Sequence, residues 1–335
     1  MLLDINKWAD QVKFARTGAE ASTIALRLAR AASGKDNVAF CGYHGWHDWY
    51  LASRLNNPDA LDNQLMADLK SDGVPKYLKG TSFPFRYNNI SDLKKIISYK
   101  KIGAIIMEVS RNIPPENNFL QNVKNIAKKN NIVLIFDECS SGFRETYGGI
   151  NIKYNIIPDI IIFGKALGNG YAINAVVGKK SVMNKIDNTF ISSTFWTERI
   201  GYVAGIATLK EMKRLKSWKI ISAKGDFIKD EWKKISDRYN LDIAISGLRP
   251  MPSFKFNFKE HNILKTFITQ EMLKKGFLAS NTIYLSVSHN ENILKKYLYN
   301  LEKIFYKISK FENFNDISKK LISNFPAQST FKRLN

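Results

Sequence analysis

The chain has 335 residues, of which 44% are apolar and 24% are charged, and its formal net charge is +21. Such a length predicts two domains, and the apolar content predicts a globular protein rather than a disordered one. No apolar run reaches the ~18 residues that a membrane-spanning helix needs, and the first residues lack the zones of a signal peptide. The only cysteines are Cys41 and Cys139, which excludes a disulfide framework and a cysteine-rich zinc site. We therefore expect a cytoplasmic protein that has no membrane partner.

The positive charge is spread along the whole chain. Lysine pairs recur from Lys94-Lys95 to Lys319-Lys320, without the aromatic or glycine punctuation of a nucleic-acid-binding stripe. Isolated pairs carry little information for reading a nucleic acid, so we interpret them as solvated surface. We expect no specific nucleic-acid partner, and a steep dependence of binding on salt would be needed to support one.

Up to about residue 200 the chain alternates helical and strand-like patterns. Strands that are separated by helices are typical of a mostly parallel sheet with helices on both faces, which is an α/β fold. We expect helices over residues 19–32, 93–99 and 118–129, strands over residues 38–41, 104–107, 132–136, 160–163 and 175–177, and an extended segment over residues 81–87.

The pattern changes after residue 200. One or two long helices are expected over residues 200–239, followed by strands over 243–246, 253–258 and 283–287 and helices over 261–275 and 291–310. The predicted division is a large domain over residues 1–238, a small C-terminal α+β domain over 239–312, and a loosely attached polar tail over 313–335.

Two of the expected strands end in charges of opposite sign. The strand over residues 160–163 leads through Gly164 to Lys165, and the strand over 132–136 leads to Asp137. A buried strand end with a charge is costly unless the charge has a partner, and parallel strands bring their carboxyl ends to one edge of the sheet. A lysine that forms a Schiff base and an aspartate that faces a pyridinium nitrogen are what pyridoxal phosphate (PLP) requires. The alternative is a snorkelling lysine beside an ordinary strand-end aspartate.

Residues 17–21 could bind an anion at the start of the first strong helix. A hydroxyl at the N-cap, Thr17, precedes Gly18 and Ala19, and the backbone amides at a helix N-terminus are free to bind phosphate. A plain capped helix without a ligand is the alternative.

The segment of residues 41–50 is rich in aromatic side chains between glycines. Glycines let the backbone approach a ligand closely, and an aromatic ring beside them can stack on a planar one. His44 and His47 are three residues apart with only Asp48 near them, so we expect packing or hydrogen bonding and no metal site.

Arg144 and the hydroxyl-rich segment of residues 192–197 can each be interpreted in two ways. Arg144 fits a structural ion pair better than a substrate carboxylate. The hydroxyls of residues 192–197 could bind phosphate or cap the long helix that follows.

Together these segments resemble the class III, fold-type I PLP-dependent aminotransferases, and most closely their glutamate-1-semialdehyde aminomutase-like branch. The order and spacing of the motifs agree from about Phe14 to the end. The resemblance implies a fold-type I PLP-transferase with a mostly parallel, seven-stranded-type sheet, helices on both faces and a smaller C-terminal α+β domain. The matching residues are Thr17-Gly18-Ala19-Glu20-Ala21, Tyr43-His44-Gly45, Asp137-Glu138, Gly142-Phe143-Arg144, Pro158-Asp159 and Gly164-Lys165 with Leu167-Gly168.

The resemblance also implies roles for single residues. Lys165 would form the Schiff base and later move the proton, and Asp137 would keep the pyridine nitrogen protonated. Thr17, Gly18 and Ala19 would bind the cofactor phosphate. Tyr43 would stack on the cofactor ring, with His44 next to it in the motif, and Glu108 would lie near the cofactor. In a homodimer, Thr194, with Thr197 as second candidate, would reach the phosphate bound by the neighbouring subunit.

Two departures from the family pattern affect these expectations. Members of the family have a sizeable segment before the phosphate motif that contributes to substrate binding and dimer contacts, whereas here thirteen residues precede Phe14. We therefore expect a shortened reading frame or half of a split protein. Thr197-Glu198-Arg199 replaces the Gly-Asn-Pro of the family, which resembles aminotransferase-like proteins of surface-glycan gene clusters.

The leading hypothesis is a transaminase that moves an amino group between an amino acid and a carbonyl compound, a semialdehyde or a sugar-derived ketone, through a Schiff base on Lys165. Its partners would be the amino donor and the carbonyl acceptor. One alternative is an aminomutase of the glutamate-1-semialdehyde type, with isomerase-like chemistry on the same apparatus. Another is a truncated, inactive subunit that scaffolds a complex.

Overall fold

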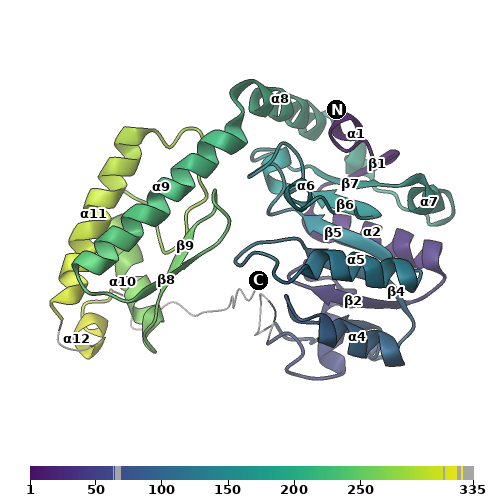
Figure 1. Ribbon diagram of the computed structural model, residues 1–335, viewed down its shortest axis with the longest axis horizontal. Coiled ribbons are helices and arrows are strands. Elements are labelled where there is room, and N and C mark those ends of the chain that lie inside the picture. Colours follow the sequence, from purple (N-terminus) through teal and green to yellow (C-terminus); the bar gives the residue numbers. More distant parts are fainter. Residues whose placement is uncertain (63, 65–68, 312–313, 323–325, 327–335) are drawn as a thin grey trace. The chain divides into compact units, whose positions relative to one another are not determined.

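The computed structural model of the chain describes residues 1–335 except 63, 65–68, 312–313, 323–325 and 327–335 (Figure 1). The chain divides into two compact units, Met1–Lys216 and a second that begins at Ser217. Each unit has a hydrophobic core of its own. No helix of the described residues is both long enough and apolar enough to span a bilayer.

A seven-stranded sheet forms the centre of the first unit, in the order β1-β7-β6-β5-β4-β2-β3 (Figure 1). Strand β7 runs antiparallel to both its neighbours, β1 and β6, and the other neighbouring strands pair in parallel. The mostly parallel α/β sheet is therefore confirmed. The strands are β1 (Gln11–Ala15), β2 (Asn37–Cys41), β3 (Ser82–Pro84), β4 (Ile102–Glu108), β5 (Val133–Glu138), β6 (Ile160–Phe163) and β7 (Asn174–Gly178).

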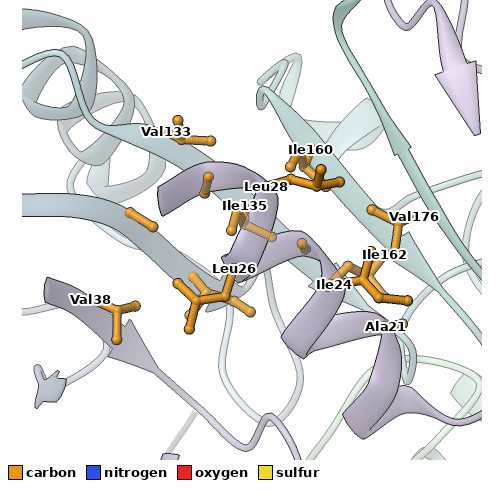
Figure 2. Close-up of a cluster of buried hydrophobic side chains, with 14 of the residues drawn as sticks. Ala21, Ile24, Leu26, Leu28, Val38, Val133, Ile135, Ile160, Ile162 and Val176 are labelled. Carbon is orange, nitrogen blue, oxygen red and sulfur yellow. The ribbon is translucent and has the colours of Figure 1, made fainter. Parts of the chain in front are cut away.

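Helices cover both faces of this sheet. Every residue of β4, β5 and β6 is buried, as expected of central strands that are covered on two sides. Side chains of α2 (Gly18–Ser33) interdigitate on one face with alternate residues of the strands (Figure 2). Helices α4 (Ile90–Tyr99) and α5 (Phe119–Lys129) lie on the opposite face (Figure 1).

Local sequence explains the bounds of α2. Thr17 and Glu20 form a capping box, in which each side chain accepts a hydrogen bond from the backbone of the other residue. Gly34 ends the helix in the left-handed conformation, with φ of 64°. The remaining elements of the first unit are α1 (Leu2–Ile5), α3 (Asp48–Leu51), α6 (Asn151–Tyr154), α7 (Lys180–Met183), α8 (Arg199–Leu215) and the 3₁₀ turns η1 (Ala52–Leu55), η2 (Lys76–Leu78), η3 (Lys165–Leu167), η4 (Asn184–Asn188) and η5 (Thr194–Thr197).

The second unit packs helices around a two-stranded antiparallel sheet. Trp232 is fully buried in its core and donates a hydrogen bond to the Tyr297 hydroxyl at 3.1 Å. The elements are α9 (Ser217–Arg238), β8 (Ile243–Ser246), β9 (Ser253–Phe256), α10 (His261–Leu273), α11 (Glu291–Ser309) and α12 (Phe314–Ser318).

The predicted domain limits differ from the units of the structure. We placed residues up to 238 in the large domain, but α9 belongs to the second unit, because Ile228 and Trp232 are part of its core. The long helical stretch breaks at Lys216, which has φ of 51°. Of the tail, Ile317 is buried in the second core, and most of the other residues lie outside the described part.

Two strand predictions also need correction. Strand β1 was not expected from the sequence, although Gln11-Val12-Lys13-Phe14 alternates polar and apolar residues, because so short a run gives a weak signal. Residues 283–287 do not form a strand. The amides of Ile283 and Leu285 donate to the carbonyls of Pro252 and Pro250, and a proline cannot return the hydrogen bond that a regular ladder requires.

Candidate active site

Lys165 and Asp137 lie at the carboxyl edge of the sheet, on adjacent strands. β5 and β6 pair in parallel, with Asp137 opposite Ile162, and Lys165 follows two residues after the end of β6. The charge of Lys165 contributes to lowering the pKa of Asp137, so the two groups are within electrostatic reach. The structure thus brings together the two strand ends that the sequence singled out.

Asp137 is a buried carboxylate with a charged environment. Its Oδ2 lies 2.8 Å from Nδ1 of His44, and its Oδ1 accepts a hydrogen bond from the Cys139 amide at 3.0 Å. Burial by itself would raise the pKa of Asp137, but the hydrogen bond and charge of His44, with smaller contributions from Cys139 and Lys165, lower it below 3.8. Asp137 is therefore an anion over the whole physiological pH range.

His44 is oriented by two oxygen acceptors. Its Nε2 lies 3.0 Å from the carbonyl of Cys41, which can only accept, while its Nδ1 faces Asp137. The imidazole is almost fully buried and is stacked on Trp49, with ring centroids 6.3 Å apart. Both ring nitrogens thus face oxygen acceptors. The two contacts fix the ring, and the ring in turn holds the Asp137 carboxylate in place through Oδ2.

Lys165 is held in an unusual backbone conformation. Its φ is 42°, a region that residues with a Cβ seldom adopt, and its ammonium group donates to the Ser140 hydroxyl at 2.5 Å. Gly164 precedes it because a Cβ there would lie 2.0 Å from Oδ1 of Asn174. Arg144 donates from Nε to the carbonyl of Ser140 at 2.7 Å, which steadies the turn that faces Lys165.

The predicted phosphate-binding residues begin α2. The Thr17 hydroxyl accepts from the amide of Glu20 at 3.2 Å, while the first amides of a helix have no intrahelical acceptor. A Cβ at Gly18 would lie 3.4 Å from Sγ of Cys139, and a Cβ at Gly45 would lie 2.6 Å from Cβ of Ala19. The loop after β2 and the turn after β5 therefore approach this helix N-terminus closely.

Tyr43 is half-buried on the loop after β2. Its ring makes an edge contact with Tyr50, with ring centroids 5.9 Å apart. Burial raises the pKa of Tyr43, while the nearby charge of Arg111 lowers it. The ring is therefore neutral, and it lies on the same loop as His44.

Glu108 ends β4, opposite Asp137 in the register of the sheet. It is almost fully buried, and its Oε1 accepts from Nη1 of Arg111 at 2.9 Å. Its Oε2 has no hydrogen-bond partner among the described residues.

Thr194 begins the exposed 3₁₀ turn η5, just before α8. Neither its hydroxyl nor that of Thr197 is buried, and the Thr197 hydroxyl donates to the carbonyl of Thr194 at 3.4 Å. The turn is connected to the start of α2 through Arg16, which donates to the carbonyl of Phe195 at 2.7 Å.

The sequence did not reveal four polar residues that complete this region. Ser140 contacts Lys165, Asn174 donates to the Arg16 carbonyl at 2.7 Å, Arg16 joins two turns, and Arg111 pairs with Glu108. A usable signal existed for Asn174, which is the one polar residue of an otherwise apolar strand. The bonds of Ser140 and Arg16 join distant segments, whereas Arg111 follows Glu108 by only three residues.

Comparison with known proteins identifies the family. The sequence matches the class-III aminotransferases over residues 2–290. The chain belongs to this family. The class-III aminotransferases depend on PLP, so the expected family, fold type and cofactor are confirmed.

Relatives of known name agree with this assignment. The chain is 34% identical over 264 residues to a 3-aminobutyryl-CoA aminotransferase of Cloacimonas acidaminovorans, an alignment that covers 76% of this chain and 60% of the relative. It is 34% identical over 316 residues to a glutamate-1-semialdehyde 2,1-aminomutase of Nitrosopumilus maritimus, covering 86% of this chain and 73% of that enzyme. The chain thus spans less than two thirds of the first of these class-III proteins.

Solved structures show the same fold. An omega-transaminase from Sphaerobacter thermophilus superimposes with a TM-score of 0.81 at 20% identity, covering 92% of this chain and 77% of that one. The PLP-containing FumI protein of Sphingopyxis sp. MTA144 gives 0.78 at 19% identity, covering 95% and 78%.

The residues present fit PLP. The Asp137 carboxylate has two protein donors, and a carboxylate can accept ~four hydrogen bonds, so a pyridinium N–H can still be accommodated. Lys165 presents an exposed primary amine at the same edge. The capped N-terminus of α2 supplies amides that suit a phosphate dianion.

Proposed function

We propose that the protein is a PLP-dependent transaminase that moves an amino group from an amino acid to a carbonyl compound, a semialdehyde or a sugar-derived ketone. The observation that supports it most directly is the exposed amine of Lys165 beside the buried, ionised Asp137 at one edge of the sheet. PLP, when bound, supplies an electron sink for negative charge at the carbon that bears the amino group.

The chain would contribute binding, orientation and proton movement. Lys165 would attach the cofactor through its amine and then move a proton at that amine. Asp137, oriented by His44, would keep the pyridine nitrogen protonated, because an ionised carboxylate favours a cationic partner. Thr17, Gly18 and Ala19 would bind the phosphate.

Three further residues would complete the cofactor site. Tyr43 would pack against the cofactor ring. Glu108 lies beside Asp137 in register and would be close to the cofactor. Thr194 would reach the phosphate bound by the partner of a homodimer. We place the protein in the cytoplasm.

Aminomutase activity is the second candidate. It is favoured by relatives named glutamate-1-semialdehyde 2,1-aminomutase, such as that of Methanocaldococcus jannaschii, 29% identical over 322 residues, with 89% of this chain and 74% of that enzyme covered. The two activities differ in stoichiometry. An aminomutase converts glutamate-1-semialdehyde alone, whereas a transaminase also consumes an amino donor and a carbonyl acceptor.

The test of the proposal is the Lys165→Ala variant. We expect wild-type protein mixed with PLP to absorb visible light, borohydride to fix the cofactor to Lys165, and Lys165→Ala to lose both the absorbance band and turnover. Lys179→Ala is the matched control, since Lys179 pairs with Asp159 at 2.7 Å, at the opposite edge of the sheet. It should retain the band. A wild-type protein that never binds PLP would instead support the inactive scaffold.

A further inference from the structure

Arg16 connects segments that are far apart in the sequence. It lies between β1 and the cap residue Thr17, and its guanidinium donates from Nε to the Phe195 carbonyl at 2.7 Å and from Nη1 to the Ala172 carbonyl at 2.8 Å. Its Nη2 forms an ion pair with Oε2 of Glu198 at 2.6 Å. One side chain therefore bonds the turn η5, the start of α8 and the loop that follows Lys165.

The backbone of Arg16 is fixed as well. Its amide donates to Oε2 of Glu20 at 3.0 Å, and its carbonyl accepts from Nδ2 of Asn174 at 2.7 Å. Glu20 is the partner of Thr17 in the capping box, and Asn174 lies against Gly164. A movement of Arg16 would therefore displace both the Thr17 turn and the surroundings of Lys165.

Two residues at the start of α8, Glu198 and Gly201, are suited to the guanidinium of Arg16. A Cβ at Gly201 would lie 2.6 Å from Nη1 of Arg16, so only glycine leaves room at that point of α8. Glu198 accepts from the Ile200 amide at 2.6 Å and so caps α8 while it pairs with Arg16. The fork of an arginine, unlike the point charge of a lysine, can serve several fixed acceptors at once.

We infer that Arg16 is a positioning residue that holds the phosphate-binding turn at Thr17 and the turn that contains Thr194 in a fixed relation. This inference rests on the proposed PLP site. An isolated exposed ion pair contributes little to stability, whereas Arg16 uses all three guanidinium nitrogens to connect two distant segments, Phe195 to Glu198 and the loop at Ala172. Preorganised turns bind phosphate more tightly because the ligand does not have to order them.

The experiment measures PLP affinity and apo-protein stability separately. Apo-protein of wild type, Arg16→Gln, Arg16→Lys and the matched control Arg86→Gln is titrated with PLP by absorbance, and the Tm of each is recorded without PLP. Arg86 forms an ion pair with Asp92, at 2.7 Å, outside the site.

We expect Arg16→Gln to remain folded at the temperature of the titration but to bind PLP about tenfold or more weakly, the equivalent of losing one well-placed hydrogen bond, whereas Arg86→Gln should keep the wild-type affinity. Arg16→Lys keeps the charge but loses the fork, so its affinity should stay closer to Arg16→Gln than to wild type. Unchanged PLP affinity in Arg16→Gln would refute the inference and leave the PLP site intact. A wild-type protein without PLP binding would refute both.

Glu198→Gln tests the same connection with Arg16 intact, and so covers the case in which Arg16→Gln is poorly folded; where Arg16→Gln folds, the two changes form a double-mutant cycle. Glu198→Gln can still cap α8 through its amide oxygen but loses the ion pair, so we expect a smaller loss of affinity. If Arg16 acts through this turn, the double variant should bind PLP no more weakly than Arg16→Gln alone. Additive losses would show that the two residues act separately and would contradict the inference.

Discussion

At the scale of single residues, Asp137 offers a sharp test because its charge and its hydrogen bonds can be separated. An asparagine at this position can still accept from the Cys139 amide but is neutral. We expect Asp137→Asn to bind PLP and to lose most of its transamination rate, since the pyridine nitrogen would no longer be held protonated. Single-turnover kinetics with an amino donor would measure the loss.

The control for Asp137→Asn is Asp159→Asn. Asp159 also belongs to the sheet, but it bonds the Leu134 amide at 3.0 Å and Lys179 at 2.7 Å. We expect Asp159→Asn to cost stability and to leave the single-turnover rate close to that of wild type. Full activity in Asp137→Asn would show that Asp137 is only a strand-end charge.

The raised pKa of Glu138 predicts that the stability of the protein depends on pH. Glu138 is fully buried, and burial raises its pKa from 4.5 to about 7, although it accepts from the amides of Ile150 and Asn151 and from the Ser141 hydroxyl. The Glu138 carboxyl binds its proton more tightly in the folded state than in the unfolded state. The stabilisation that results is therefore fully present below pH 4.5 and is lost as the pH rises to about 7.

Glu138→Gln should remove this dependence. Denaturant unfolding of both proteins at pH 5 and pH 8 would measure it. We expect the free energy of unfolding of the variant, relative to wild type, to be higher at pH 8 than at pH 5 by about 3 kcal/mol, or 1.36 kcal/mol for each unit of pKa shift. A difference that is the same at both pH values would contradict the raised pKa.

At the scale of elements, two glycines inside helices should respond to alanine in opposite ways. In α9, a Cβ at Gly225 would lie 1.6 Å from the carbonyl oxygen of Arg249, and backbone cannot yield as a flexible side chain does. In α8, the nearest atom to a Cβ at Gly205 is Cδ1 of Ile173 at 3.7 Å, which is an ordinary contact. Gly205→Ala therefore serves as the matched control for Gly225→Ala.

We expect Gly205→Ala to stabilise the protein by up to about 1 kcal/mol, because alanine favours a helix over glycine. Gly225→Ala should destabilise it by more than about 2 kcal/mol, since α9 or the loop of Arg249 must move. Thermal unfolding would compare the two variants. An unaffected Gly225→Ala variant would mean that this loop does not pack on α9.

At the scale of the whole molecule, we predict a homodimer in which Thr194 of one subunit binds the phosphate held by Thr17 and Gly18 of the other. Phe190 and Phe195, on either side of Thr194, are 90% and 71% exposed, which is the kind of apolar surface that an interface buries. Neither subunit would then contain a complete site.

Mixing two inactive variants tests the shared site. If Thr194 acts in trans, each mixed dimer of Lys165→Ala and Thr194→Ala has one site with both wild-type residues, so about a quarter of all sites should recover. Thr189→Ala is the matched control, since the Thr189 hydroxyl donates to the Ile186 carbonyl at 3.1 Å, and it should remain active by itself. No recovery after proven subunit exchange would show that Thr194 acts within its own chain or not at all.

Much of the fold was predictable from the sequence because it depends on local periodicity. The helix at residues 18–33, with Thr17 at its start and Gly34 at its end, needs only side chains that are close in the chain. The buried strands around residues 102–108, 133–138 and 160–163 were equally clear, since central strands of a parallel sheet are continuous apolar runs.

The sequence by itself also singled out the central residues of the candidate site. Lys165 and Asp137 stood out because a charge at the end of a buried strand needs a partner, and adjacent parallel strands bring such ends to one edge. The motifs around them indicated the class-III family, which the comparisons confirm.

Only the tertiary structure decided which distant segments meet. Strand β1 forms because β7 offers it an edge, and α9 joins the second unit because its apolar face completes that core. Arg16 and Ser140 became visible as parts of the site through their bonds to Phe195 and Lys165. Their partners are 25 to 179 positions away, and no local pattern of residues encodes a contact that the folding of the whole unit creates.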